Sequence, residues 1–337
     1  MIKKKKYVLA AIPNLKGLVL LVILTQVTIF SLAQNTAKKE SAQEIKLIKI
    51  DDHTTLEVID WGGTGTPIFF LPGIGATAHI FQDFAPKFTD KYHIYGLTRR
   101  GFGSSSQPVS GYDINTLAHD ILCIADSLSL KQIVLIGHSF AGQEVTKFAS
   151  AYPDRVKKVI YLDAAYDWTQ MLSLYQNAPT PPEPTRENFS SLEHNRKYLK
   201  KVTGVLFPEE EMRARFIFDK KGKYIGNVSP DSISLHIIAQ LEKPDYRLIK
   251  AKALAIYVRN TDLIELFPSY STFDTTNKNK ADAHYQLMKA FTLNGQNAFT
   301  TGLTNGTIKE LVNANHYIFL SNPIETEKLI RKFLDKK

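Results

Sequence analysis

The chain has a single cysteine, Cys123, among its 337 residues. An internal disulfide is therefore excluded, and an apolar core has to stabilise the fold. Cys123 lies within an apolar helical pattern, so we expect it to be a small buried hydrophobic side chain rather than a reactive thiol.

The signatures of several function classes are also missing. The sequence has no H-E-x-x-H motif and no cysteine pair, and its nine histidines are scattered, so no metal site is predicted. The Gly-x-Gly runs at 73–75 and 101–103 lack the rest of the dinucleotide-binding fingerprint, which argues against NAD. No internal repeat is present, and we expect no cofactor.

The positive charge of the chain is concentrated at its N-terminus. Of the 42 basic residues that give a formal charge of +9, five lie in residues 1–33, which contain no acid. The remainder has 37 basic residues against 33 acidic ones, and this small excess of positive charge is not typical of a protein that binds nucleic acid. We therefore predict no nucleic-acid partner, and we interpret Arg99-Arg100 and the lysines at 220–223 as solvated faces or turns.

Residues 1–33 have the pattern of a secretory signal. Four lysines at 3–6 precede a mostly apolar stretch at 18–32, and Ser31-Leu32-Ala33 places small residues where a signal peptidase reads them. We predict cleavage after Ala33, export to the periplasm or the medium, and no membrane span in the mature protein, which would begin with a polar leader at 34–44. The alternative is an uncleaved N-terminal anchor, which Lys16 and the short apolar core disfavour.

From residue 45 onward, predicted strands and helices alternate. The strands are expected at 45–50 and 54–61, as an antiparallel hairpin, and then at 68–71, 92–97, 133–136, 156–162, 253–258 and 307–312. The helices of this core are expected at 78–88, 114–128, 140–152, 281–294 and 323–334. This alternation predicts an α/β fold with a mostly parallel central sheet, flanked by helices, that binds ligands at the carboxyl ends of its strands.

Residues 164–250 interrupt the alternation. They are proline-dense at 181–184 and have helical patterns at 191–202, 209–218 and 231–241. A crossover between neighbouring strands needs far fewer residues. We therefore predict a helical cap inserted between a first core segment, 45–163, and a second one, 251–337. The alternative is a separate domain of unrelated function.

The chemistry is concentrated at Ser139. The β-branched run at 133–136 leads through Gly137-His138-Ser139-Phe140-Ala141-Gly142 directly into a helix that Pro153 ends. A serine in such a tight turn is exposed at the tip of the sheet, beside the unpaired N–H groups of the helix start. The pattern predicts a nucleophile elbow.

Four ordered motifs resemble those of the α/β-hydrolase family, over about residues 45–334. The run at 137–142 is similar to G-x-S-x-G, with Ala141 in place of the second glycine and Gly142 just after it. LPGIG at 71–75 resembles H-G-x-x-G, RRGFGSSS at 99–106 resembles R-G-x-G-x-S, and NHYIFLSNP at 315–323 resembles the family's histidine motif.

The resemblance implies a catalytic triad. Ser139 would be the nucleophile and His316 the base, and the family's order of serine, acid and histidine favours Asp262, four residues beyond Val258, as the acid. Asp163, at the end of another strand, is the alternative acid.

An oxyanion hole would be formed by the backbone N–H groups of Phe140 and Ile74. The candidates for the lining of the substrate pocket are His79, Tyr166 and Trp168, together with the Phe140 and Ile74 side chains. His138 is expected to be structural.

The resemblance implies an exported serine hydrolase of the carboxylesterase type that cleaves a small-molecule ester through an acyl-enzyme. Related dehalogenases and epoxide hydrolases use an aspartate nucleophile, so Ser139 argues against both activities. Four alternatives stay open: a cofactor-free perhydrolase, a C–C hydrolase, a prolyl aminopeptidase-like enzyme, although LPGIG replaces that group's GGPG loop, and a non-catalytic small-molecule-binding protein. The sequence does not indicate an oligomeric state.

Overall fold

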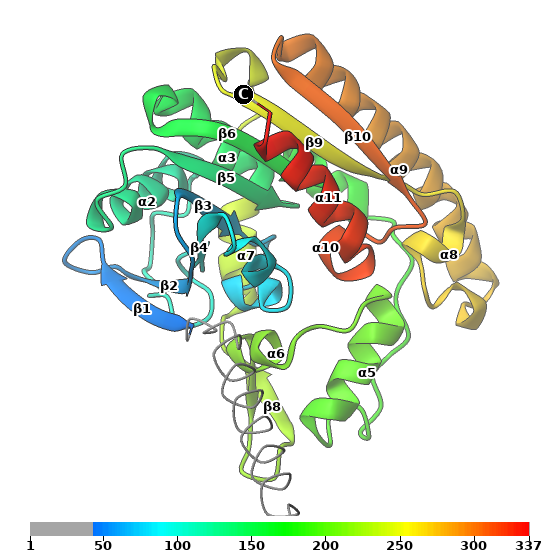
Figure 1. Cartoon of the computed structure of the whole chain (residues 1–337). Helices are drawn as coiled ribbons and strands as arrows, with labels where there is room; N and C mark the ends of the chain where they lie inside the picture. Colours follow the sequence, from blue (N-terminus) through cyan, green and yellow to red (C-terminus); the bar gives the residue numbers. More distant parts are fainter. Residues whose placement is uncertain (1–42, 337) are drawn as a thin grey trace, which may run out of the picture. The chain divides into compact units, whose positions relative to one another are not determined.

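An eight-stranded sheet organises the chain in the computed structural model, which describes residues 43–336 (Figure 1). Its strand order is β1-β2-β4-β3-β5-β6-β9-β10. The strands are β1 (Glu44–Lys49), β2 (Thr55–Gly62), β3 (Thr66–Leu71), β4 (Tyr92–Leu97), β5 (Ile133–His138), β6 (Val156–Leu162), β9 (Lys252–Arg259) and β10 (Gly306–Val312). β1 pairs with β2, and β2 with β4, in antiparallel fashion, while all other neighbours are parallel. The predicted mostly parallel sheet is confirmed.

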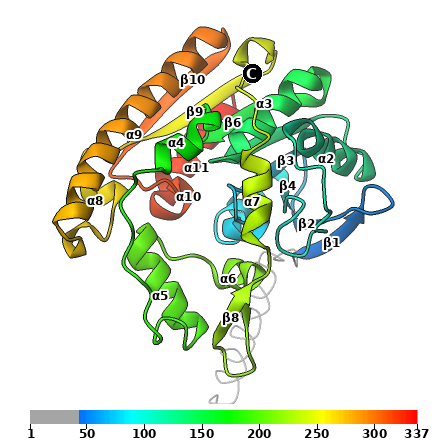
Figure 2. The ribbon, with the colours of Figure 1, turned by 180° about the vertical axis from the view of Figure 1, so that it is seen from behind.

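Helices cover both faces of this sheet. One face packs against α2 (Ile114–Ser127), α3 (Ala141–Ala151) and α9 (Thr275–Gly302). The other face packs against α10 (Ile318–Ser321), α11 (Pro323–Leu334) and two short 3₁₀ helices. α11 accordingly lies in front of the sheet in Figure 1 and behind it in Figure 2.

Two of the predicted helices differ from the structure. The segment 78–88 forms two 3₁₀ helices, η1 (Ala78–Phe81) and η2 (Ala85–Phe88), instead of one continuous helix. Pro86 explains the break, because its ring would collide with the carbonyl group four residues earlier in an α-helix. α9 is much longer than the predicted 281–294, because Asp274 caps a polar first turn that carries no apolar periodicity.

Cys123 is also more accessible than predicted. It lies on α2, but the thiol is free and the residue is only partly buried.

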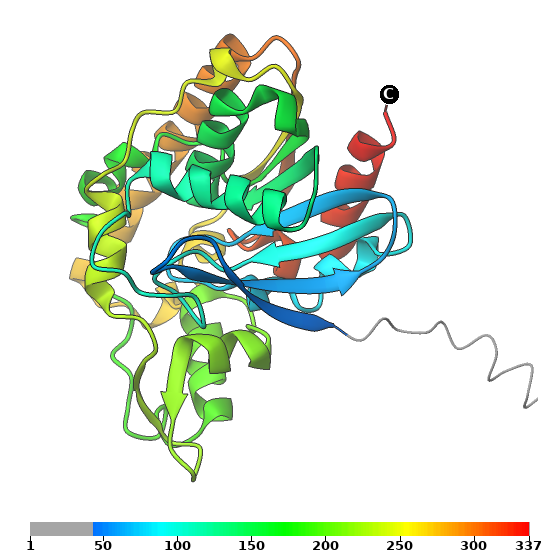
Figure 3. The ribbon, with the colours of Figure 1, turned by 90° about the vertical axis from the view of Figure 1, so that its left-hand side faces the viewer.

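Between β6 and β9 lies a segment of mixed secondary structure, which we call the insert (residues 163–251). Its helices are α4 (Met171–Tyr175), α5 (Leu192–Thr203), α6 (Glu209–Arg215) and α7 (Asp231–Ile238), with 3₁₀ turns η4 (Trp168–Gln170) and η5 (Tyr246–Leu248). The helix predicted at 209–218 ends at Arg215, since the next residues form β7 (Phe216–Phe218), which pairs with β8 (Tyr224–Asn227) as a hairpin. The insert is therefore not entirely helical. Figure 3 shows α5, α6 and this hairpin, in green to lime, gathered on one side of the sheet.

Within residues 43–336, no helix is both long and apolar enough to cross a bilayer. The predicted signal at 1–33 and nearly all of the leader at 34–44 lie outside the described residues.

Candidate active site

Ser139 lies at the junction of β5 and α3, where the chain turns sharply from strand to helix. Its φ angle is 54°, in the left-handed region that non-glycine residues seldom adopt. The strained turn is held by a hydrogen bond of 3.2 Å from the Ser139 amide to the Leu162 carbonyl of the neighbouring strand. Such strain is characteristic of functional turns, and this geometry is that of a nucleophile elbow.

Gly142, rather than residue 141, is the position of the elbow that requires a glycine. A Cβ atom at Gly142 would lie 2.0 Å from the Ala164 carbonyl oxygen, so the backbone after β6 passes directly against α3. Ala141 is fully buried without conflict. The turn therefore accommodates Ala141 at the position where G-x-S-x-G has its second glycine.

Asp163 follows β6 and also has a left-handed backbone, with a φ of 47°. Its Oδ2 lies 2.6 Å from His316 Nδ1. Its Oδ1 accepts hydrogen bonds from the Tyr166 hydroxyl at 2.5 Å and from the Val258 amide at 3.0 Å. Both oxygens of this buried carboxylate are thus engaged, which fixes its orientation toward the imidazole.

The preference for Asp262 as the partner of His316 was wrong. Asp262 is the N-cap of α8 (Leu263–Leu266), where its carboxylate accepts from the Ile264 amide at 3.1 Å, and Glu265 bonds back to the Asp262 amide. An aspartate after a strand can either cap the free amides of the next helix or pair with a catalytic histidine. Asp262 does the first, and Asp163 is the carboxylate next to the imidazole.

His316 lies on the loop between β10 and α10. With Nδ1–H donating to Asp163, Nε2 keeps its lone pair, which is the tautomer that a general base needs. The adjacent Asn315 donates to the Thr203 carbonyl at 2.7 Å, so the insert helps to hold this loop. No hydrogen bond joins Ser139 to His316 in this structure, and such contacts commonly tighten only when substrate binds.

His138 connects the elbow to the histidine loop. Its Nε2 lies 3.0 Å from the His316 carbonyl oxygen, and the two imidazole rings are 4.7 Å apart. Burial, with the neighbouring His316 adding to it, lowers the pKa of His138 well below its ordinary value. His138 is therefore neutral and acts as a structural spacer.

The loop after β3 passes directly over Ser139. A Cβ atom at Gly73 would lie 3.0 Å from the Ser139 Cβ, so a larger residue there would press against the nucleophile. The amides of Ile74 and Phe140 donate to no other described residue. They are therefore available as the two donors of an oxyanion hole, which must lie beside the nucleophile.

Arg99, which the sequence suggested was solvated, is buried beneath this loop. Its guanidinium donates to both Glu144 carboxylate oxygens, at 2.5 and 2.6 Å, and to the Pro72 carbonyl at 2.8 Å. Because Glu144 lies on α3, Arg99 ties the loop over the nucleophile to the helix that carries it. Arg100 is equally buried, with Asp120 as its partner at 2.7 Å. The signal that sequence reasoning missed was an acid, Glu144, on the inward face of a core helix.

A cavity of about 210 Å³ lies beside the imidazole. Both Asp163 and His316 line it, as do Tyr166 and Trp168, two of the predicted pocket residues. His79, the third, lies elsewhere, with its Nε2 3.4 Å from the Glu57 carboxylate. The structure therefore separates His79 from this cavity.

Comparisons with known proteins agree with this architecture. Residues 66–194 match a family model described as the alpha/beta hydrolase fold. The crystal structure of E-2-(acetamidomethylene)succinate hydrolase superposes with a TM-score of 0.62 at 18% identity, covering 87% of this chain and all of that one. This chain has the alpha/beta hydrolase fold.

Two curated proteins are similar to this chain in part of their sequence. The 2-(acetamidomethylene)succinate hydrolase of Mesorhizobium japonicum is 30% identical over 101 residues, which are 30% of this chain and 36% of that protein. A non-heme chloroperoxidase of Streptomyces lividans is 34% identical over 120 residues, 35% of this chain and 44% of that protein. The chain thus aligns with less than half of the length of either relative.

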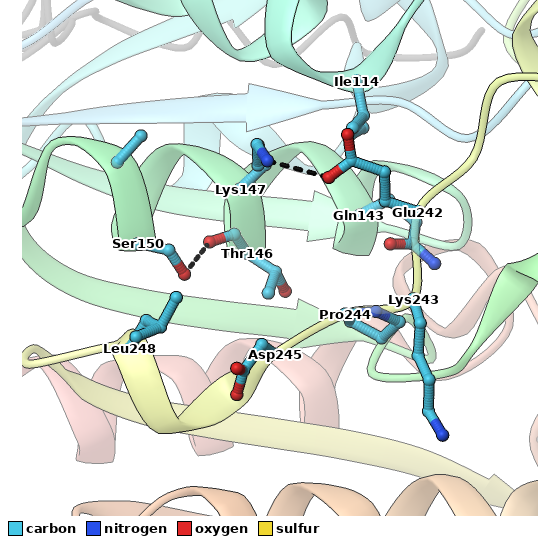
Figure 4. Close-up of a pocket in the computed structure, with 11 residues that line it drawn as sticks. Ile114, Gln143, Thr146, Lys147, Ser150, Glu242, Lys243, Pro244, Asp245 and Leu248 are labelled. Carbon is cyan, nitrogen blue, oxygen red and sulfur yellow. Dashed lines mark hydrogen bonds and ion pairs between the residues drawn. The ribbon is translucent and has the colours of Figure 1, made fainter.

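A second cavity, of about 310 Å³, lies away from the predicted site residues (Figure 4). It is formed by α3 and the segment before η5, and its edge carries the ion pair between Lys147 and Glu242, at 2.8 Å. None of the predicted site residues lines this cavity. We therefore assign it no role in the chemistry at Ser139, although it is larger than the cavity beside His316.

Residues 43–336 contain no cluster of three or more histidine, cysteine or acidic side chains that is placed to hold a metal ion.

Proposed function

We propose that this protein is a serine hydrolase that cleaves a carboxylic ester through an acyl-enzyme. The observation that carries the proposal is the bond between Asp163 and His316 Nδ1, because it leaves Nε2 as a base on the loop that His138 ties to the elbow. A protein that only bound a small molecule would not need an oriented imidazole, a strained serine and two free amides together.

The reaction follows from the geometry. His316 Nε2 takes the hydroxyl proton of Ser139 while the Ser139 Oγ attacks the ester carbonyl carbon. The Phe140 and Ile74 amides bind the oxyanion that forms. When the intermediate collapses, the ester C–O bond breaks and His316 returns its proton to the leaving oxygen. Water, deprotonated by His316, then attacks the acyl-enzyme and releases the acid and free Ser139.

We infer that the insert acts as a cap over this site. Its α6 contributes Glu211, whose carboxylate accepts hydrogen bonds from Thr77, on the loop that also carries Ile74. The contact between Asn315 and Thr203 joins the insert to the histidine loop as well. The insert thus contacts both the loop after β3 and the histidine loop, which supports a role in enclosing the substrate.

The test is hydrolysis of short-chain nitrophenyl esters by the purified full chain. Ser139→Ala and His316→Ala should each abolish turnover, because each removes a group that forms or breaks a bond. Ser150→Ala is the matched control, since this serine lies on the same helix and only bonds the Thr146 carbonyl. Labelling of Ser139 by a fluorophosphonate, lost in Ser139→Ala, is the second readout, and a wild-type protein that neither turns over esters nor is labelled would refute the proposal.

The likeness to a non-heme chloroperoxidase favours perhydrolysis as a second candidate. In that reaction hydrogen peroxide replaces water in the attack on the acyl-enzyme, and the products are a peracid and free Ser139. Formation of peracid from an ester and peroxide, at a rate above that of hydrolysis, would favour this activity over esterase activity.

A further inference from the structure

The cavity beside His316 is lined by two carboxylates and by no lysine or arginine. It is lined by parts of α4, α5, α8, α9 and the loops after β6, β9 and β10, and these contribute no lysine and no arginine to the lining. Its two carboxylates are those of Asp163 and Glu265. Asp163 is engaged as described above, and Glu265 accepts from the Thr261 amide at 2.7 Å. No lysine or arginine of the lining lies beside either carboxylate.

The remaining lining mixes aromatic rings with aliphatic, hydroxyl and amide side chains. Two of its residues each carry a buried polar atom without a hydrogen-bond partner in the described chain. One is the Trp168 Nε1–H, a donor. The other is His284 Nδ1 on α9. Because the Leu174 carbonyl bonds the other nitrogen of that ring, Nδ1 is a free acceptor.

The position of the cavity indicates which part of a substrate it receives. His316 has to return its proton to the leaving oxygen, so the leaving group must lie on the His316 side of Ser139. Of the proposed oxyanion donors, Ile74 lies with Gly73 on the loop after β3 and Phe140 lies at the start of α3, and none of these residues lines the cavity. The cavity therefore suits the leaving group and not the carbonyl oxygen.

We propose that the cavity beside His316 binds an uncharged leaving group and excludes anionic ones, so that the protein prefers neutral esters over esters whose leaving group carries a carboxylate. This inference rests on the proposed function. An anion placed there would give up its hydration and meet two carboxylates, with no lysine or arginine to pair with it. A neutral aromatic or alkyl alcohol would meet aromatic rings instead.

The test compares a matched pair of esters. The neutral methyl 4-acetoxybenzoate and the anionic 4-acetoxybenzoate share their acyl group and differ in the charge of the leaving group. We expect kcat/KM to be at least tenfold higher for the neutral ester, mainly through KM. A second pair, 4-nitrophenyl butyrate and the 4-nitrophenyl monoester of succinate, places the charge on the acyl side instead, and we expect it to give a smaller ratio.

A variant reverses the electrostatics of the cavity. Leu266 lines it from α8, so Leu266→Arg should lower the neutral-to-anionic ratio of the first pair about tenfold, again through KM. Leu266→Met, which changes shape without adding charge, should keep the wild-type ratio. The ratio of the wild-type enzyme tests the inference even where Leu266→Arg does not fold.

Two kinds of failure are distinguishable. Equal kcat/KM for both esters of the first pair, or discrimination confined to the acyl pair, would overturn the inference while the serine hydrolase stood. Absence of turnover on all four esters, with no fluorophosphonate labelling of Ser139, would overturn the proposed function and the inference with it.

Discussion

Asp163 has an unusual backbone conformation and a carboxylate whose two oxygens are both hydrogen-bonded. Its backbone is in the left-handed region and its carboxylate makes three hydrogen bonds, to His316, Tyr166 and Val258. Burial, with the adjacent Asp163 charge adding to it, raises the pKa of Tyr166 well above its ordinary value. The Tyr166 hydroxyl therefore stays a donor over the whole useful pH range and holds the carboxylate in place.

Replacing Asp163 by asparagine should lower kcat for an ester by about a thousandfold or more, because the amide can stabilise the wrong imidazole tautomer. Asp262→Asn is the matched control: asparagine still caps α8, so kcat should stay within about twofold of wild type. Steady-state kinetics of both variants on one nitrophenyl ester distinguish the two acids. A large loss in Asp262→Asn with an active Asp163→Asn would reverse our assignment.

How far the sequence predicts this site depends on how unambiguous each signal is. Ser139 and His316 could be found because each combines a rare sequence context with a strand end. The acid could not, since Asp163 and Asp262 both follow strands and only the three-dimensional packing distinguishes a helix cap from a partner of His316. The Arg99–Glu144 pair was missed for a related reason, because charged residues are expected at the surface unless their partner is known.

At the scale of elements, the elbow depends on a contact between α3 and the strand beside it. Gly142→Ala should destabilise the protein by about 1–3 kcal/mol, because the new Cβ would lie within 2.0 Å of the Ala164 carbonyl oxygen. Ala141→Gly, which restores the usual motif at the neighbouring position, should cost no more than about 1 kcal/mol. Urea unfolding of the two variants measures both values, and equal stabilities would contradict the role given to Gly142.

The joint between the insert and the core should respond to pH. Glu211 is fully buried, and burial raises its pKa to about 7, although Arg215, at 3.8 Å, the bonds from Thr77 and the charge of His79 all act to lower it. Below the ordinary pKa of 4.5 the folded and unfolded states both bind the proton. Between 4.5 and about 7 only the folded state keeps it, so the free energy of unfolding falls as pH rises and levels off above 7.

Glu211→Gln removes this titration while keeping a hydrogen-bonding side chain. Between about pH 5 and about pH 8, we expect the wild type to lose about 3 kcal/mol of stability relative to the variant. Urea unfolding at several pH values checks this difference, with Glu209→Gln, an exposed acid on the same helix, as the control. Parallel pH profiles of wild type and Glu211→Gln would show that Glu211 does not titrate as described.

The elements themselves were predicted well where periodicity is strong and poorly where it is not. The strands at 92–97 and 156–162 and the helix at 323–334 have the predicted bounds. The β7–β8 hairpin was missed, because its strands of three and four residues are too short for an alternating pattern, and Phe216 continues the apolar spacing of α6.

At the scale of the whole molecule, the predicted export signal has a direct test. If residues 1–33 are removed on secretion, the protein recovered from the periplasm or medium of a bacterial host should begin at Gln34. N-terminal sequencing and the intact mass measure this. Ala33→Leu, which blocks the small-residue position before the cut, should leave a longer, membrane-associated form, whereas an uncut wild-type chain would favour the anchor.

The placement of the acid on β6 has a consequence for how this scaffold can change. Since Asp163 and His316 come from the ends of β6 and β10, the intervening segment 260–274, which includes α8, carries none of the proposed catalytic groups. It nevertheless supplies Glu265 and Leu266 to the cavity beside His316. Loop grafting or random mutagenesis confined to that segment could therefore retarget the enzyme toward new alcohols while the chemical machinery is inherited intact.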